Sequence, residues 1–229
     1  GHAVLGVAAG TGSQGSGAWS RVLEKYGLTV LNYMPETSAT KGVKADYIDR
    51  KRKGLVKGVD RGVSQSEINE AGPAIEKANS TLERMDVSNM VGDRAFDYDI
   101  IAAQYHQIKN ANAVFAVGEL DMSGNPKTHY RTLKKMPGWA VQMALDKGTR
   151  KVFIFDQTKG NEGWYKWSNV KDRFEAIDFA PKLLKNSAVV APPKYKDITS
   201  EGREAIKEVA KVTFGDKATV KSKVKGAVP

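Results

Sequence analysis

The sequence predicts an α/β protein with a mainly parallel β-sheet and a basic C-terminal extension, and two segments support this prediction. Residues 4–34 have the pattern of strand, glycine-rich loop, helix and strand, which is the length of one parallel β-α-β crossover. Residues 113–117 form another apolar run, and a helical pattern at 137–147 leads into a buried-strand pattern at 152–156. Parallel strands joined by helices are therefore expected over most of the chain.

The first crossover places a glycine-rich loop directly before a helix. Val4–Ala8 is the apolar run, the glycines lie within Gly10–Gly17, and the helix begins near residues 16–18 and ends at Gly27. Leu28–Met34 alternates as the next strand. The free N–H groups and partial positive charge of such a helix start favour a phosphate or carboxylate. A purely structural tight turn is the alternative explanation of the same glycines.

Two common nucleotide-binding motifs are incomplete in this loop. Its glycines match the spacing G-x-G-x-x-G, but Asn32 and Tyr33 stand where an NAD-binding fold has an acidic residue for the ribose. No Gly-Lys-Ser/Thr follows, so the loop is not a P-loop. The pattern predicts an anion site without specifying its ligand.

A polar, basic excursion is expected at residues 35–64. Its candidate nucleic-acid contacts are Arg50, Lys51, Arg52 and Lys53. Residues 66–85 then carry apolar side chains three and four positions apart, with a kink or a new start at Gly72-Pro73. A connector at 87–96 and a helix at 98–110 lead into the strand at 113–117.

Three loops are expected to meet at the carboxyl edge of the sheet, where open parallel sheets bind ligands: 10–17, 118–138 and 156–163. The middle loop carries Glu119 and Asp121, the candidate catalytic residues, each of which is otherwise an ordinary solvated loop residue. The aromatic cluster at 164–167 has two explanations, stacking on a base or closing the edge of the sheet.

Composition limits the function classes. The chain has 229 residues and a net charge of +10, and residues 181–229 hold 11 Lys and Arg against 5 Asp and Glu. Such a charge balance favours polyanions or simply solubilises the surface. There are no cysteines, and the three histidines lack metal-ligand spacing, so no metal or other cofactor is predicted. No apolar run is long enough to span a membrane, and a cytoplasmic location is expected.

Three segments together resemble a known family. They are GTGSQGSGAWSRVLEKYGLTV, QYHQIKNANAVFAVGEL, and PGWAVQMALDKGTRKVFIFDQ followed by WYKW. In this order they resemble the DprA-like branch of the SLOG superfamily, found in phage and microbial proteins, which groups the DNA-processing protein A fold with the "lonely guy" phosphoribohydrolases. The resemblance covers about residues 3–167 and implies a Rossmann-like three-layer sandwich that binds nucleotides at glycine-rich loops. Homo-oligomers are common in this superfamily, so one is expected here by resemblance.

The resemblance also implies roles for individual residues, with departures. Gly15, Ser16, Gly17 and Trp19 match a Gly-Ala-Asp-x-Ala-Trp-like segment of the branch, and Gly138, Trp139 and Gln142 match its Gly-Trp-Ala-Val-Gln segment. Ser16 stands where the branch has Ala or Asp. Val141 and Gln142 stand nearest to the catalytic glutamate of the hydrolases. Hydrolysis would then require Glu119 or Asp121 as a substitute.

The sequence therefore predicts a Rossmann-like nucleotide-binding domain at residues 3–168 and a basic extension at 169–229 with one helix near 199–212. We expect it to bind a nucleotide or nucleotide-derived ligand without efficient chemistry. A nucleotide N-glycosidase or transferase and a nucleic-acid-binding protein of the DNA-processing type are the alternatives. The expected ligand-binding residues are Gly10, Gly12, Ser13, Gly15, Ser16, Gly17, Trp19, Gly118, Gly138, Trp139 and Gln142, with Trp164 as a further candidate for base contact.

Overall fold

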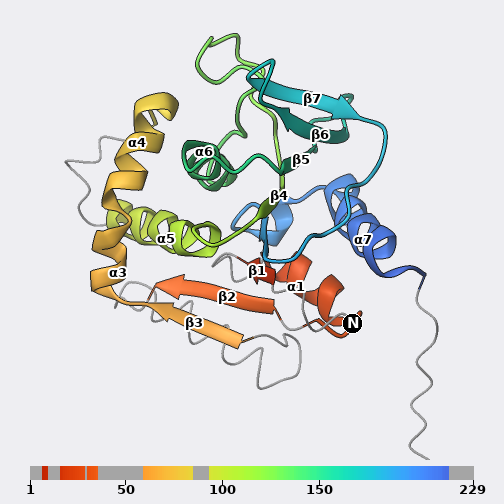
Figure 1. The fold of residues 1–229 in the computed structure, drawn as a ribbon, viewed down its shortest axis with the longest axis horizontal. Coiled ribbons are helices and arrows are strands. Elements are labelled where there is room, and N and C mark those ends of the chain that lie inside the picture. The colour runs from red at the N-terminus through yellow and green to blue at the C-terminus, as the bar shows by residue number, and fades with distance from the viewer. Residues whose placement is uncertain (1–6, 10–15, 29, 36–58, 85–92, 217–229) are drawn as a thin grey trace, which may run out of the picture.

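The computed structural model describes residues 7–9, 16–28, 30–35, 59–84 and 93–216, and its centre is an open, mixed and mostly parallel sheet (Figure 1). The strand order is β3-β2-β1-β8-β4-β5-β6-β7. The six strands from β3 to β5 in this order are parallel. Strand β6 is antiparallel to both of its neighbours, β5 and β7. The strands are β1 (Val7–Ala9), β2 (Val30–Pro35), β3 (Val59–Val63), β4 (Ala113–Gly118), β5 (Val152–Asp156), β6 (Gly163–Ser168), β7 (Arg173–Ile177) and β8 (Ser187–Val190).

Helices cover both faces of this sheet. One face carries α4, α5 and α6, and the other carries α1 and α7 (Figure 1). The described helices are α1 (Ser16–Glu24), α3 (Gln65–Glu70), α4 (Gly72–Leu82), α5 (Asp93–Ile108), α6 (Pro137–Asp146) and α7 (Ser200–Phe214), with a short 3-10 helix η4 (Tyr195–Asp197) before α7. The α/β class predicted from the sequence is confirmed.

Strand β4 explains why two cores form. All six of its residues are buried, and successive side chains of a strand point to opposite faces. Val114 and Ala116 pack with α5 and α6, whereas Phe115 and Val117 pack with α1 and α7. A strand buried on both sides has a continuous apolar sequence, which is what the run AVFAV shows.

The elements around β4 lie where the sequence predicts them. Helix α6 begins at Pro137 and ends at Asp146, and β5 follows at Val152–Asp156. Helix α1 begins at Ser16, and Gly27 turns the chain with a φ of +81°. Thr199 caps α7 by accepting a hydrogen bond from the Gly202 N–H at 3.0 Å.

The domain boundary expected at residue 168 does not match the structure. Strand β8 lies between β1 and β4 in the middle of the sheet, and α7 covers one face. Residues 173–214 are therefore part of the same fold as residues 7–168. Only four residues, SAVV, form β8, and its pairing with β1 joins segments far apart in sequence. A pattern of local periodicity cannot reveal such a strand.

Two other expectations require correction. The excursion at 35–64 contains β3, an edge strand whose VDRGV sequence lacks an apolar alternation. Helix α5 already begins at Asp93, inside the expected connector. The remainder of the excursion at 36–58, including Arg50, Lys51, Arg52 and Lys53, and the basic end of the chain at 217–229 lie outside the described residues.

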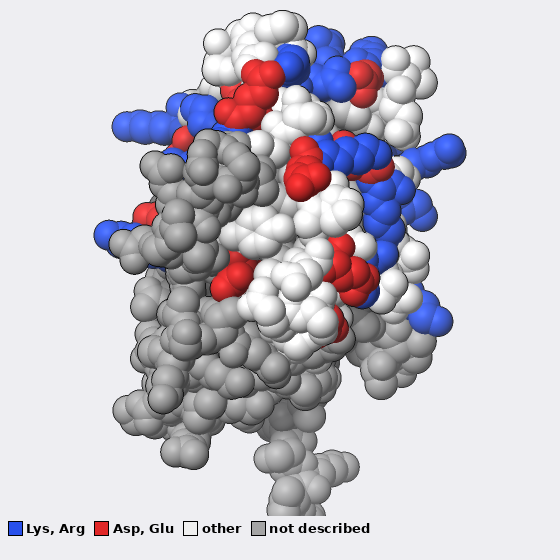
Figure 2. Space-filling model, turned by 90° about the vertical axis from the view of Figure 1, so that its left-hand side faces the viewer, with Lys and Arg blue, Asp and Glu red and all other residues white. Residues whose placement is uncertain are grey.

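The described surface and helices limit possible partners. Figure 2 shows the face near α3 and α4, where basic and acidic side chains are interspersed over the described residues. The described residues of this face therefore form no patch of a single sign that would attract a polyanion. Among the residues that the structure describes, no helix combines the length and apolarity that crossing a membrane requires.

Candidate functional site

The connections of the sheet define where a ligand would bind. The chain leaves the carboxyl end of β1 toward β2 on the α1 face, and it leaves β4 toward β5 on the α6 face. Strand β8 lies between them and leads through residues 191–199 into α7. Ligands of open α/β sheets bind in the crevice where neighbouring connections diverge in this way. The expected ligand crevice of this sheet is therefore the carboxyl edge around β1, β8 and β4.

A small cavity, here called the edge pocket, lies at this position. It is lined by Gly118, Glu119, Lys134, Lys135, Pro137, Gln157, Pro192, Pro193 and Asp197. Two of the three loops that the sequence predicts to meet at this edge, those after β4 and β5, contribute to it, and the loop after β8 is an addition. The volume of about 40 Å³ is far below the roughly 300 Å³ of a typical ligand pocket. The pocket could therefore hold only one small group of a larger ligand.

Hydrogen bonds from Asp156 and Arg84 fix the loop between β4 and α6. The Asp156 carboxylate, fully buried at the end of β5, accepts hydrogen bonds from the backbone N–H groups of Leu120 and Thr158, each at 3.0 Å. The Arg84 guanidinium donates to the carbonyls of Leu133 at 2.9 Å and Lys135 at 3.0 Å. The walls of the edge pocket are therefore preorganised.

Glu119, a predicted catalytic residue, lies at the rim of the edge pocket. Its carboxylate faces Lys134 Nζ and Lys135 Nζ, each at 3.8 Å, and 37% of its side chain is exposed. Glu119 therefore forms ion pairs with two lysines at a partly exposed rim. The arrangement favours a charged, solvated rim over proton transfer.

Asp121, the second predicted catalytic residue, braces the loop internally. Burial opposes its ionisation, but hydrogen bonds from Ser123 and Thr128 and the charge of Arg84 outweigh this effect and lower the pKa of Asp121. The Arg84 Nη2 atom lies 3.8 Å from the carboxylate, and burial lowers the pKa of Arg84. Asp121 does not line the edge pocket. A carboxylate held ionised inside a loop cannot serve as a general acid at neutral pH.

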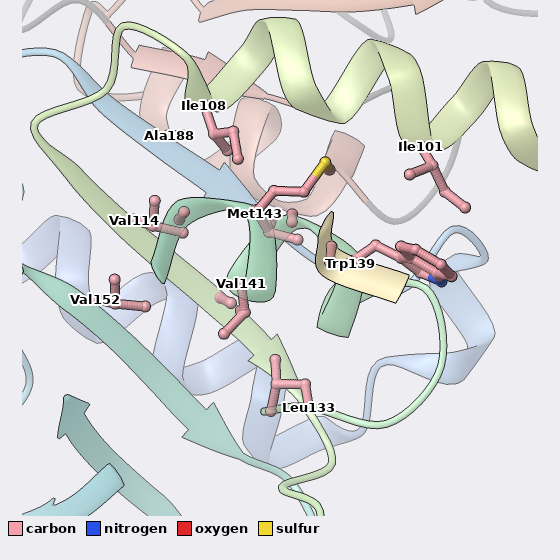
Figure 3. Close-up of a cluster of buried hydrophobic side chains, with 14 of the residues drawn as sticks. Ile101, Ile108, Val114, Leu133, Trp139, Val141, Met143, Val152 and Ala188 are labelled. Carbon is pink, nitrogen blue, oxygen red and sulfur yellow. The ribbon is translucent and has the colours of Figure 1, made fainter. Parts of the chain in front are cut away.

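Gly138 and Trp139 pack inside the protein and are not exposed to a ligand. A Cβ atom on Gly138 would lie 2.0 Å from the Leu133 carbonyl oxygen and 2.4 Å from Arg84 Nη1. Glycine is therefore required at this position because the loop passes directly over the helix. Trp139 is 3% exposed and lies beside Ile101 of α5 (Figure 3). The expected phosphate contact at Gly138 and base contact at Trp139 do not fit this packing.

Trp19 also has a structural position. It is fully buried, and its indole Nε1–H donates to the Val190 carbonyl at 3.1 Å, which ties α1 to the carboxyl end of β8. Trp164 and Trp167 of β6 are buried as well, at 5% and 8% exposure. Both tryptophans therefore pack against the sheet and are not exposed for stacking on a base.

The remaining predicted ligand residues are spread over two places. Gly118 ends β4 in the wall of the edge pocket, and Gly17 lies in the first turn of α1. Gln142 lies elsewhere, in a cavity of about 230 Å³ between the C-terminal half of α6 and the β6–β7 hairpin. Ser16 begins α1, but its side chain is not described, and Gly10, Gly12, Ser13 and Gly15 lie outside the described residues.

The larger cavity is poorly suited to a phosphate. Gln142 Nε2 donates to Asp146 Oδ1 at 2.8 Å, and the other oxygen of this carboxylate has no hydrogen-bond partner among the described residues. Burial raises the pKa of Asp146. The Asp146 carboxyl group and the partial negative charge at the C-terminal end of α6 both lie beside this cavity, and neither attracts a phosphate. We therefore place the candidate site at the carboxyl edge.

Two features of the edge were not predicted from the sequence. Gln157 bridges β5 to the start of α7, because its Nε2 donates to the Asp197 carbonyl at 2.8 Å and its Oε1 accepts from the Thr199 N–H at 3.1 Å. Tyr195 of η4 is 38% exposed, and the guanidinium groups of Arg21 and Arg203 lie over its ring. The Gln directly after a strand and the PKYK stretch are the only sequence signals for them.

Metal sites and similarity to known proteins add no further assignment. Within the described part of the chain, no group of three or more His, Asp or Glu side chains could hold a metal ion. His106 donates through Nε2 to the Glu67 carbonyl at 2.7 Å, and His129 accepts from the Gly124 N–H at 3.0 Å, so each supports local structure.

No protein-family model matches the chain, and no curated protein matches it either. The functional proposal therefore rests on geometry.

Proposed function

We propose that this protein binds a nucleotide or nucleotide-derived ligand at the carboxyl edge of a Rossmann-like sheet, and that it does so without efficient chemistry. The observation that carries the proposal is the divergence of the β1 and β4 connections at the edge where α1 begins. The resemblance of the glycine-rich loop and the Gly-Trp-Ala-Val-Gln segment to the DprA-like branch of the SLOG superfamily supports the same ligand class.

Electrostatics at this edge favour an anionic ligand. The first turn of α1 holds no acidic residue, so its N-terminal partial charge is not offset by a side chain of the same turn. The start of α7 lies at the same edge, since a Cβ atom on Gly202 would contact Val117 of β4 at 3.0 Å and the Gln157 side chain at 2.8 Å. Two helix starts therefore face the region where a phosphate would lie.

The candidate acid–base residues support binding without catalysis. Glu119 is paired with two lysines, and Asp121 is held ionised by its own loop. General acid catalysis of N-glycoside cleavage requires a carboxyl group whose pKa is raised toward neutrality, whereas the pKa of Asp121 is lowered. We therefore expect no released base when nucleoside monophosphates are incubated with the protein.

The experiment is a thermal-shift screen of the full chain against nucleoside mono-, di- and triphosphates and ADP-ribose. A ligand at about one hundred times its dissociation constant adds about 2.7 kcal/mol to the free energy of unfolding. The matched variant is Gly17→Val. Among the described residues, the atoms nearest to a Cβ on Gly17 belong to the Arg21 guanidinium, at 3.9 Å, which is ordinary van der Waals contact. The valine side chain would enter the space beside the helix start, and a thermal melt without ligand establishes that the variant is folded.

Stabilisation of the wild-type protein by one nucleotide class, and its reduction in Gly17→Val, is the expected result. The absence of any nucleotide response would refute the proposed function. Release of base by the wild-type protein that Glu119→Gln abolishes would instead favour the glycosidase alternative.

A further inference from the structure

A cluster of basic side chains surrounds an exposed tyrosine beside the edge pocket. We name it the Tyr195 cluster, and it consists of Arg21, Lys194, Tyr195, Lys196 and Arg203. Tyr195 lies in η4, between the Pro193 and Asp197 residues that line the pocket. The cluster and the pocket are therefore neighbouring parts of one surface.

The two guanidinium groups converge on the same ring. The Arg21 guanidinium carbon is 4.8 Å from the centre of the Tyr195 ring, and that of Arg203 is 5.3 Å from it. The distance between the two guanidinium carbons therefore cannot exceed the sum of these two distances. Attraction to the face of an aromatic ring holds each cation in place and fixes the planar donor groups of both.

Each arginine also folds back toward the start of its own helix. The Arg21 guanidinium carbon lies 3.9 Å from the position of a Cβ on Gly17, in the first turn of α1. Arg203, in the first turn of α7, donates to the Ile198 carbonyl just before that helix begins. Two positive side chains and two positive helix ends are consequently gathered in one place.

This concentration of positive charge is not neutralised by close carboxylates in the described part of the chain. Among those residues, no carboxylate forms an ion pair within 4.0 Å with Arg21, Lys194, Lys196 or Arg203. Glu201 offsets the charge of Arg203 only in part. Hydrogen bonds, first from its own backbone N–H and then from Ser200, and to a smaller extent the charge of Arg203 lower the pKa of Glu201, but the two side chains form no ion pair within 4.0 Å. Converging cations whose charge is only partly offset are stabilised when an anion binds beside them.

We propose that the Tyr195 cluster binds the diphosphate group of a nucleotide, with Arg21 and Arg203 as its principal contacts. This inference rests on the proposed function and specifies the ligand: a nucleoside diphosphate or a related ester, bound more tightly than the monophosphate. Two guanidinium forks can each engage one phosphate, because planar donors match the spacing of phosphate oxygens. Lys194 and Lys196 add charge at the rim.

The test is isothermal titration calorimetry of the full chain at about 150 mM salt with pyrophosphate, AMP, ADP and a short single-stranded DNA. The variants are Arg21→Gln and Arg203→Gln, with Arg150→Gln as the matched control, because Arg150 is an exposed residue in the turn that precedes β5, far from the carboxyl edge. Arg203→Lys keeps the charge without the planar fork and tests whether geometry matters. Thermal melts establish that each variant is folded.

The expected result is that ADP and pyrophosphate each bind about tenfold more weakly to Arg21→Gln and to Arg203→Gln, and unchanged to Arg150→Gln. ADP should bind the wild-type protein more tightly than AMP, and Arg203→Lys should recover only part of the loss.

Other outcomes separate the two proposals. Binding of ADP that neither arginine variant weakens would overturn the inference and leave the proposed function standing. Arginine-dependent binding of pyrophosphate without binding of any nucleotide would support the anion site and refute the proposed function. Arginine-dependent binding of DNA that ADP and pyrophosphate do not displace would overturn the diphosphate assignment in favour of nucleic acid. Absence of binding by every probe would overturn both.

Discussion

Substitution of Gly138 by alanine tests whether this glycine serves packing or a ligand. In the folded protein the new Cβ would lie 2.0 Å from the Leu133 carbonyl oxygen, a backbone atom that cannot rotate away. The loop between β4 and α6 would have to move, and Arg84 would lose its hydrogen bonds to the carbonyls of Leu133 and Lys135. Hydrogen bonds from a charged group contribute about 1.5–3 kcal/mol each, and overpacking costs about 1–3 kcal/mol.

Taking the low end of these ranges for both hydrogen bonds and the overpacking, we expect Gly138→Ala to lower the free energy of unfolding by about 4 kcal/mol. For a chain of this size that corresponds to a loss of about 8–16 °C in Tm. Urea denaturation and thermal melting measure the effect. Gly163→Ala is the matched control, since its Cβ would meet nothing within 4 Å, and it should change stability by less than about 0.5 kcal/mol. A Gly138→Ala protein as stable as the wild type, with only ligand binding impaired, would refute the packing argument.

Three further predictions concern polar groups of the loops. The pKa of Asp121 is lowered in the folded state, so its ionised form stabilises the protein. The destabilisation caused by Asp121→Asn should therefore be full at pH 7 and shrink as the pH falls below the ordinary aspartate pKa. A difference in stability that does not depend on pH would contradict this. Burial raises the pKa of Asp146, so the stability of Asp146→Asn relative to wild type should rise with pH through that raised value, and a fall would contradict the assignment. Gln157→Ala removes the bridge between β5 and α7 and should cost about 1–3 kcal/mol in urea denaturation, whereas an unchanged transition midpoint would show that the bridge is dispensable.

The central unit of the fold was predictable because its signals are local. The run AVFAV gives a strand buried on both faces, Pro137 starts α6, and the Lys147-Gly148 pair ends it. These signals lie within a few residues of the elements they specify. The same is true of the capped start of α7 at Thr199.

Strand β8 was not predictable on these grounds. Its four residues belong to the sheet because β1 and β4 flank them, and those strands lie far away in sequence. A short run such as SAVV is common in loops and helix ends, so only tertiary pairing distinguishes it. The error at residue 168 follows directly, because the segment after that position supplies the missing central strand.

The meeting of two loops at the carboxyl edge was predictable, but the packing of the residues around it was not. The loops after β4 and β5 do meet at the carboxyl edge, as sheet topology requires. Trp19 and Trp139, however, are buried, since an aromatic side chain at helical spacing suits a core as well as a ligand. Arg21 and Arg203 could not be paired from the sequence, because only the fold brings α1 and α7 to the same tyrosine.

The location of the site is tested most directly by hydrogen–deuterium exchange of the full chain with and without saturating ADP. We expect slower exchange at the carboxyl edge, in residues 16–20, 118–121, 157–160 and 194–203, and unchanged exchange in residues 146–151 and 169–172 around the larger cavity. Protection confined to those last two segments, or no protection anywhere at saturating ADP, would contradict this location of the site.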